Sequence, residues 1–292
     1  MALEISDNQI LTLYRHYAEA LKGLYDENEA KALARLVFQE IIGISPARLF
    51  ADPTQLLTES EILNVHFAFK DLLKGKPIQY LIGKAYFRGL ELHVEPGVLI
   101  PRPETEELVG LVIEDFRNSE GIRILDIGTG SGCIAISLAR ELKNPVVYAL
   151  DNHDTALAIA SQNAQKHNVR IDFQKNNILD PTGWDDLPRQ LDVVISNPPY
   201  ITESEKHGLH RNVTGYEPPE ALFVPDDEPL IFYKAITSTA HSILKSGGRL
   251  YYEINEKLGK EIAHLLKETG FCNVSVINDF RGKDRFVVAH RP

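Results

Sequence analysis

The fold is decided by the stretch DIGTGSG at residues 126–132, which completes the short apolar run Ile122–Ile127. Glycines at every second position let the backbone turn sharply and approach a ligand without hindrance from Cβ atoms. Asp151 ends the next predicted strand, Val146–Leu150, where it can accept hydrogen bonds from ribose hydroxyls. Open α/β sheets bind ligands at the carboxyl ends of their strands. The stretch therefore predicts a strand-to-helix turn that binds a cofactor, with a turn serving packing alone as the alternative.

Two cofactor classes suit such a turn, NAD and S-adenosylmethionine (SAM). The dinucleotide fingerprint is G-x-G-x-x-G. Here Cys133 occupies the position of its third glycine, and the third glycine of the loop comes one residue early. Asp126, just before the loop, favours a ligand that carries an ammonium and a sulfonium over a diphosphate. The loop therefore predicts SAM.

Beyond residue 122 short apolar runs alternate with helical patterns, which predicts an α/β fold with a doubly wound, mostly parallel sheet, Rossmann-like in type. The predicted strands are 122–127, 146–150, 171–173, 191–196 and 249–254, and the predicted helices are 134–142, 155–167, 231–244 and 257–269. The last two apolar runs, 274–277 and 286–289, lie too close in sequence for a crossover helix between them. We expect them to form an antiparallel hairpin at the sheet edge.

The chain before this domain divides into two parts. Residues 1–76 have helical periodicity, and Asp26 with Glu29 and Thr58 with Glu61 have the spacing of capping boxes. Residues 77–101 read as a β-hairpin linker. The predicted domains are thus a helical bundle at 1–76, a linker hairpin at 77–101 and a cofactor-binding domain at 102–292.

A second motif, NPPY at residues 197–200, follows the apolar strand 191–196 directly. Successive prolines remove two backbone donors and stiffen the chain, which leaves carbonyl groups available as acceptors. The Asn197 side-chain oxygen and a proline carbonyl make two acceptors for a planar –NH2 group, and Tyr200 can cover its flat face. The motif predicts methylation of an amide or exocyclic amino nitrogen, with a rigid turn as the alternative.

With both motifs in place, the whole chain resembles the class I SAM-dependent N-methyltransferases, specifically the release-factor glutamine N5-methyltransferases. The segment LIPRPETE at residues 99–106 adds to this resemblance. It implies transfer of a methyl group from SAM, with S-adenosylhomocysteine as product, to the Gly-Gly-Gln glutamine of bacterial class I release factors. It also implies that the N-terminal bundle recognises this substrate. The cofactor residues implied are Gly128, Thr129, Gly130, Ser131, Gly132, Asp151, Ile178 and Asn197. Those implied for the target amide are Asn197, Pro198, Pro199 and Tyr200, of which Asn197, Pro198 and Tyr200 are catalytic.

Three other functions remain open at this point. A related enzyme that methylates a glutamine of a ribosomal protein tends to carry Pro-Arg-Ser-Pro where this chain has IPRPETE, a segment in which Arg102 and Glu104 are candidate supporting residues. Adenine-N6 methyltransferases of DNA or RNA share the amino-group chemistry. A non-catalytic module that binds release factors or ribosomes would carry damaged motifs, whereas both motifs here are intact.

Composition bears on these alternatives. The 292 residues carry 31 basic and 41 acidic side chains, a formal charge of −10, which disfavours nucleic acid and anionic membranes as partners. Two cysteines make neither a disulfide framework nor a metal cluster. No apolar run reaches the length of a membrane span and no signal peptide is apparent, so we expect a cytoplasmic protein without a metal.

Overall fold

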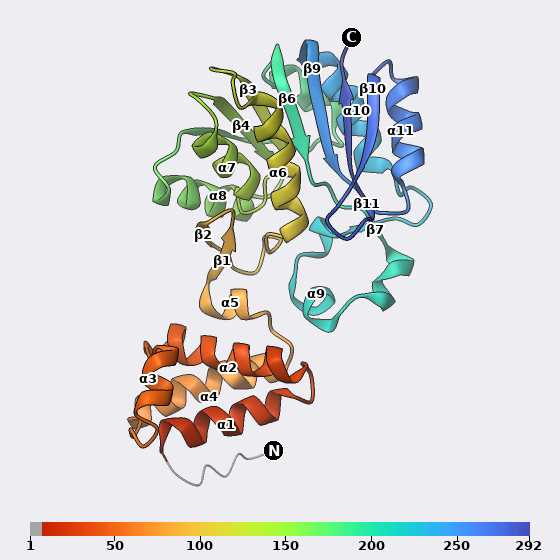
Figure 1. The fold of residues 1–292 in the computed structure, drawn as a ribbon. Helices are drawn as coiled ribbons and strands as arrows, with labels where there is room; N and C mark the ends of the chain where they lie inside the picture. Colours follow the sequence, from red (N-terminus) through yellow and green to blue (C-terminus); the bar gives the residue numbers. More distant parts are fainter. Residues whose placement is uncertain (1–7) are drawn as a thin grey trace. The chain divides into compact units, whose positions relative to one another are not determined.

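The computed structural model describes residues 8–292, which form two units (Figure 1). The first unit combines residues 8–83 with the distant segment His210–Tyr216, and the second contains Lys84–Leu209 and Glu217–Pro292. The predicted linker 77–101 is divided between them, because its first residues form a short helix that groups with the bundle. Among the described residues, no helix has the length and apolar character needed to cross a membrane.

The first unit is a helical bundle. Its helices are α1 (Ile10–Leu21), α2 (Glu27–Ile42), α3 (Pro46–Ala51), α4 (Glu59–Leu73), α5 (Ile78–Ile82) and, from the later segment, α9 (Arg211–Tyr216). The Asp26 side chain accepts backbone N–H bonds at the start of α2, and Thr58 with Glu61 forms both halves of a capping box before α4. In the core, the rings of Tyr17 and Phe69 stack with their centroids 4.0 Å apart. Capping and apolar periodicity thus suffice to explain the bundle.

The later segment joins this bundle through side chains. The Asn212 amide nitrogen donates to the Tyr25 hydroxyl at 3.3 Å, and the Tyr216 hydroxyl donates to the Lys74 carbonyl at 3.4 Å. A Cβ on Gly75, which has φ +92°, would come within 3.1 Å of the Asn212 side-chain oxygen. The chain therefore leaves the second unit after Leu209 and returns to it at Glu217.

The second unit is built on a seven-stranded sheet with the strand order β10-β11-β9-β6-β3-β4-β5. Its strands are β3 (Arg123–Ile127), β4 (Val146–Asp151), β5 (Ile171–Lys175), β6 (Leu191–Ser196), β9 (Leu244–Glu253), β10 (Cys272–Asn278) and β11 (Asp284–His290). The five strands from β9 to β5 pair in parallel, whereas β11 is antiparallel to both β9 and β10. The predicted mostly parallel sheet and its antiparallel terminal hairpin are both confirmed.

Helices cover both faces of this sheet (Figure 1). They are α6 (Pro103–Phe116), α7 (Cys133–Glu141), α8 (Asp154–Lys166), α10 (Ile231–Ile243) and α11 (Gly259–Glu268). Ile124 and Val193 pack in one core with residues of α6, α7 and α8, whereas Leu125 and Val194 pack in a second core with residues of α10 and α11. Because successive strand residues point to opposite faces, the continuous apolar runs of β3 and β6 supply both cores.

Short elements complete the second unit. They are the hairpin β1 (Lys84–Phe87) with β2 (Leu90–His93), the parallel pair β7 (Ile201–Thr202) with β8 (Phe223–Val224), and the 3₁₀ turns η1 (Pro181–Asp186), η2 (Glu203–Gly208) and η3 (Pro219–Ala221). Among these short elements, only the first hairpin is predicted from the sequence. The pair β7–β8 and the turns η2 and η3 all lie in the part of the chain that follows the NPPY motif.

Candidate active site at the carboxyl ends of the strands

The glycine loop is a tight turn between β3 and α7. The Gly128 and Thr129 amides both donate to the Leu150 carbonyl at 2.9 Å, so the loop is tied to the end of β4. Gly128, Gly130 and Gly132 have φ values of +76°, +53° and +82°, which only glycine adopts at little cost. A Cβ on Gly132 would also come within 3.3 Å of the Ala160 backbone, so close packing against α8 requires glycine there as well.

Asp126 supports the loop from below. Its carboxylate is fully buried and accepts the Thr129 hydroxyl at 2.7 Å. Burial raises the pKa of this carboxyl to about 7, against hydrogen bonds that lower it. Because Asp126 is not among the residues that line the adjacent cavity, it acts on the loop rather than directly on a ligand.

Asp151 connects the end of β4 to the same loop. One carboxylate oxygen accepts the Gly130 N–H at 2.9 Å, and the other accepts the His153 N–H at 3.1 Å. The carboxylate also borders the cavity. Asp151 therefore both holds the loop backbone and offers acceptor capacity to a ligand.

A cavity opens above these strand ends. The space within it is about 820 Å³, a figure that includes the part open to solvent. Of the residues predicted for cofactor and substrate, the lining contains Gly128, Gly130, Asp151, Ile178, Asn197, Pro198 and Pro199. The predicted residues outside this lining are Thr129, Ser131, Gly132 and Tyr200. The structure thus brings both motifs to one cavity, while part of each motif supports it from behind.

Part of the cavity lining is apolar. Ile178, Phe232 and Ile236 line the cavity and belong to one hydrophobic cluster, the last two from α10. The Trp184 indole nitrogen donates to the Ile178 carbonyl at 3.1 Å and so anchors the segment that carries Ile178. Trp184 is therefore a loop anchor. Apolar side chains of this kind suit a flat heterocycle.

The NPPY motif starts where β6 ends. The buried Ser196 hydroxyl donates to the Ile127 carbonyl at 2.7 Å, which joins the end of β6 to the end of β3. Asn197 follows, and its amide nitrogen donates to the Thr105 hydroxyl at 3.1 Å. The Tyr200 hydroxyl donates to Glu253 at 3.1 Å. Burial and the nearby Glu253 charge raise the Tyr200 pKa well above its ordinary value, so this phenol stays protonated.

Two residues of this constellation were missed by sequence reasoning. Thr105 lies in the PETE segment and Glu253 ends β9, and both are buried. Burial raises the pKa of the Glu253 carboxyl, whereas bonds from Thr105 and Tyr200 and the charge of Arg285 lower it. An acid at the carboxyl end of a parallel strand was a usable signal for Glu253, because ligands bind at such ends.

Other cavity residues were also missed. His153 lies between Asp151 and Glu220, with ring nitrogens 3.6 and 3.7 Å from their carboxylates. Glu220 belongs to η3, in the segment after Tyr216, for which the sequence offered no motif.

Arg102 and Glu104 differ in their surroundings. The Arg102 guanidinium donates to Glu217 at 2.5 Å, and the other oxygen of Glu217 accepts the Ile100 N–H at 3.0 Å. The Glu217 side chain is only 1% exposed, so Arg102 compensates a buried charge. Glu104 lies partly buried in the first turn of α6. Within residues 8–292, no group of three His, Cys, Asp or Glu side chains is arranged to hold a metal ion.

This geometry can hold a cofactor and a planar amino group side by side. The glycine loop and Asp151 offer backbone and carboxylate partners in the lining of the cavity, and Asn197 with two prolines offers acceptors in the same lining. Cys133 is buried, and its thiol pKa is raised to about 12 by that burial, so it is not a nucleophile.

Comparison with known proteins agrees with this arrangement. Residues 102–213 match the family model of the methyltransferase small domain, and residues 12–83 match that of the PrmC N-terminal domain. Two solved structures are similar in fold, a methyltransferase from Pyrococcus furiosus (20% identity, 70% of this chain and 90% of that chain, TM-score 0.52) and the 16S rRNA N2 G1207 methyltransferase of T. thermophilus (16% identity, 72% and 50%, TM-score 0.51).

The sequence relatives extend over nearly the whole chain. A release factor glutamine methyltransferase of Flavobacterium psychrophilum is 41% identical over 93% of this chain and 95% of its own. Relatives of the same name from Bacteroides thetaiotaomicron and Chlorobaculum tepidum are 40% and 36% identical, over 94% and 88% of this chain and 97% and 89% of theirs. The chain therefore belongs to the release factor glutamine methyltransferase family of SAM-dependent methyltransferases.

Proposed function

We propose that this enzyme transfers a methyl group from SAM to the side-chain amide nitrogen, N5, of the glutamine in the Gly-Gly-Gln motif of bacterial class I release factors. The observation that carries the proposal is the position of Asn197. It lies at the end of β6 and lines the same cavity as Gly128, Gly130 and Asp151. Family membership supports the same substrate.

The residues that line the cavity support SAM as its ligand. Asp151 can accept hydrogen bonds from ribose hydroxyls, and the apolar side chains of Ile178, Phe232 and Ile236 suit adenine. The loop at 128–132 leaves room for the methionine part, because Cβ atoms at Gly128 and Gly130 would meet nothing within 4 Å. When bound, SAM supplies an electrophilic methyl group on its sulfonium.

The protein's contribution is positioning and acceptance of hydrogen bonds. An amide nitrogen is a poor nucleophile because its lone pair is delocalised into the carbonyl. Two acceptors, the Asn197 oxygen and a proline carbonyl, hold both N–H bonds and raise electron density on the nitrogen. Placing two reactants in contact contributes roughly 7–11 kcal/mol, and each preorganised hydrogen bond about 3–4 kcal/mol. Transfer would form the N–C bond as the S–C bond of SAM breaks with its electron pair returning to sulfur, and the proton released from the nitrogen would pass to solvent water.

The N-terminal unit recognises the protein substrate in this proposal. On α4 the side chains of Leu63 and Phe67, one helical turn apart, are 53% and 58% exposed. We propose that these two side chains contribute to the surface that contacts the release factor. The formal charge of −10 agrees with a protein substrate rather than DNA or RNA. We propose a cytoplasmic location for the enzyme.

The test compares wild-type enzyme with its Asn197→Ala variant, each with a purified release factor as the substrate. We expect the methylation rate to fall at least about 100-fold, the loss typical of one preorganised hydrogen-bond partner, while the Kd of SAM changes much less. Mass spectrometry of the Gly-Gly-Gln peptide measures the rate and calorimetry the Kd. The matched control is Asn118→Ala, which alters an exposed asparagine just after α6. Near wild-type methylation by Asn197→Ala would remove Asn197 from the reaction.

A further inference from the structure

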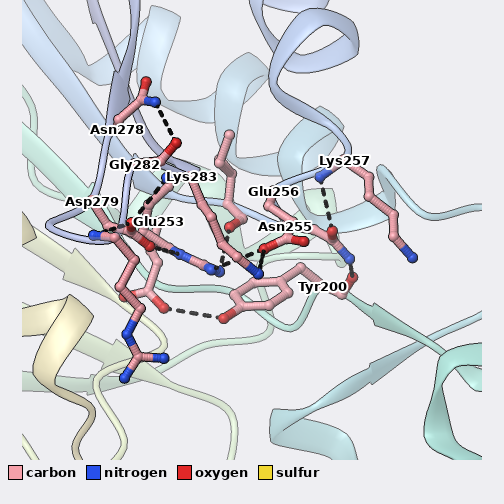
Figure 2. Close-up of polar contacts among 12 residues, drawn as sticks. Tyr200, Glu253, Asn255, Glu256, Lys257, Asn278, Asp279, Gly282 and Lys283 are labelled. Atoms are coloured by element: carbon pink, nitrogen blue, oxygen red, sulfur yellow. Dashed lines mark hydrogen bonds and ion pairs between the residues drawn. The ribbon is translucent and has the colours of Figure 1, made fainter. Parts of the chain in front are cut away.

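A buried chain of hydrogen bonds runs behind the cavity. The Asn197 amide nitrogen donates to the Thr105 hydroxyl at 3.1 Å, and Thr105 donates to one oxygen of Glu253 at 2.7 Å. The Tyr200 hydroxyl donates to the other Glu253 oxygen at 3.1 Å (Figure 2). Thr105 and Glu253 are 2% and 1% exposed. One carboxyl group from β9 therefore holds both polar side chains of the NPPY motif.

The donors and acceptors in this series of hydrogen bonds follow one fixed direction. A threonine hydroxyl has a single proton, and Thr105 gives it to Glu253. Thr105 can then only accept from Asn197, and the carboxamide group must direct its nitrogen to Thr105. The Asn197 oxygen is thereby left for the cavity that Asn197 lines.

This direction matters for an amide substrate. An asparagine side chain can exchange its oxygen and nitrogen by a 180° rotation at little steric cost. If the Asn197 nitrogen faced the cavity, its N–H donors would lie against the two N–H donors of the substrate and no hydrogen bond could form. With the oxygen there, it accepts one of them.

We propose that Glu253 and Thr105 are positioning residues for methyl transfer, which fix the Asn197 carboxamide with its oxygen toward the target –NH2 group. The inference rests on the proposed function only for the identity of that group.

Surrounding contacts hold Glu253 and Tyr200 in place. The Asn255 side chain donates to the Tyr200 carbonyl at 3.3 Å, so Tyr200 is held at its backbone as well as its hydroxyl (Figure 2). The Tyr233 hydroxyl donates to the Glu253 backbone carbonyl at 3.1 Å. Arg285 of β11 bonds to the Ile254 carbonyl at 3.3 Å and to Asp279 at 3.2 Å, which ties the terminal hairpin to the end of β9.

A pair of substitutions separates the hydroxyl of Thr105 from its packing. Thr105→Val keeps the side-chain shape and removes the hydroxyl, whereas Thr105→Ser keeps the hydroxyl and removes a methyl group. We expect Thr105→Val to lower kcat about 30- to 100-fold, somewhat less than loss of a direct hydrogen-bond partner. The KM for the protein substrate and the Kd of SAM should stay within about threefold, because Thr105 touches neither. Thr105→Ser should restore kcat to within about threefold of wild type.

Glu253→Gln tests the direction of the hydrogen bonds that link Glu253, Thr105 and Asn197. A glutamine amide can donate to Thr105, which would free the Thr105 proton for the oxygen of a rotated Asn197. We expect a kcat as low as that of Thr105→Val. Wild-type kcat in Thr105→Val or Glu253→Gln would overturn the proposal, as would equal impairment of Thr105→Ser and Thr105→Val.

If the variants fail to fold, a measurement on wild-type protein that does not depend on catalysis still tests the proposal. In wild-type protein labelled with ¹⁵N-asparagine, the Asn197 side-chain –NH2 signal is identified by its disappearance in Asn197→Asp. We expect its exchange with solvent to be at least tenfold slower than that of the exposed Asn118. Exchange as fast as that of Asn118 would show that Thr105 does not hold the amide nitrogen, and would overturn the proposal.

The two proposals fail in different ways. If wild-type enzyme leaves release factor unmodified, the proposed function fails, and the same variants are then compared on the acceptor that wild-type enzyme does methylate. If wild-type enzyme modifies release factor and Thr105→Val does so equally well, the positioning proposal alone fails.

Discussion

At the scale of single residues, Asp151 has two tasks that one substitution can separate. Its carboxylate borders the cavity and also accepts the Gly130 N–H at 2.9 Å. We expect Asp151→Ala to raise the Kd of SAM about 10- to 100-fold, about 1.4–2.8 kcal/mol. Asp151→Asn retains an acceptor for Gly130 and should have a smaller effect. Calorimetry measures both, with the exposed Asp154→Ala as control, and an unchanged Kd in Asp151→Ala would remove Asp151 from the ribose site.

Asp126 makes stability depend on pH. Its pKa is about 7 in the folded protein and 3.8 ordinarily, so the folded state binds the proton more tightly than the unfolded state. The free energy of unfolding therefore decreases as pH rises from about 4 to about 7, and the full cost of the buried charge is present above pH 7. That cost is up to about 4 kcal/mol at ~1.4 kcal/mol per pKa unit.

The test is Asp126→Asn, which removes the charge and keeps the shape. We expect the stability of the variant relative to wild type to increase between pH 5 and about 7.5 and then to level off, as measured by urea unfolding. Asp185→Asn serves as control because its side chain is 98% exposed. A stability difference that stays constant with pH would contradict the shifted pKa.

Residues at strand ends were predictable, and their partners were not. Gly128, Asp151 and Asn197 each follow an apolar run, and parallel strands bring their carboxyl ends to one edge. The bond between Thr105 and Glu253 joins residues 148 positions apart. This hydrogen bond depends on the position of β9 next to β6 in the sheet. The apolar periodicity of the sequence does not specify that strand order.

At the scale of elements, β9 shows why the first and last residues of a strand were harder to predict than the presence of the strand. The apolar pattern predicts that this strand begins at residue 249, whereas it begins at Leu244. Residues 245–248, Lys-Ser-Gly-Gly, have the composition of a turn, and Gly247 has φ +77°. A Cβ on Gly248 would come within 2.9 Å of the Leu191 carbonyl, so the irregular start of β9 packs directly against β6. Tertiary pairing thus overrides local turn propensity.

The segment before α6 and the segment after α9 are joined by Arg102 and Glu217. Removal of Arg102 leaves a buried carboxylate with the Ile100 N–H as its remaining partner. We expect Arg102→Ala to lower the free energy of unfolding by about 1–3 kcal/mol, below the ~3–5 kcal/mol of a fully buried pair because Arg102 is partly exposed. Glu217→Gln should cost less, since water can solvate the released guanidinium. Denaturant unfolding measures both, and a larger cost for Glu217→Gln would contradict this asymmetry.

At the scale of the whole molecule, the chain passes between the two units three times, after Gly83, after Leu209 and after Tyr216. The sequence predicted a helical N-terminal part and a doubly wound second part. It did not predict that His210–Tyr216 groups with the bundle, because this segment has polar composition and its contacts lie with Tyr25 and Lys74, more than a hundred residues away. The segment begins ten residues after the NPPY motif, so the same connection that leaves Tyr200 enters the first unit.

The net charge of the whole molecule distinguishes a glutamine methyltransferase from an adenine methyltransferase of DNA or RNA. Enzymes that methylate an adenine amino group extrude the base from its stack and grip a phosphate backbone, whereas this chain carries ten more acidic than basic residues. A protein glutamine therefore remains the expected acceptor.

The most direct test offers wild-type enzyme and methyl-labelled SAM a release factor, a ribosomal protein, DNA and RNA in parallel, and locates the label by mass spectrometry. A release factor in which the Gly-Gly-Gln glutamine is replaced by alanine serves as the matched control. We predict one methyl group on that glutamine, none on the control, and no label in nucleic acid. Label in DNA or RNA alone would contradict the account.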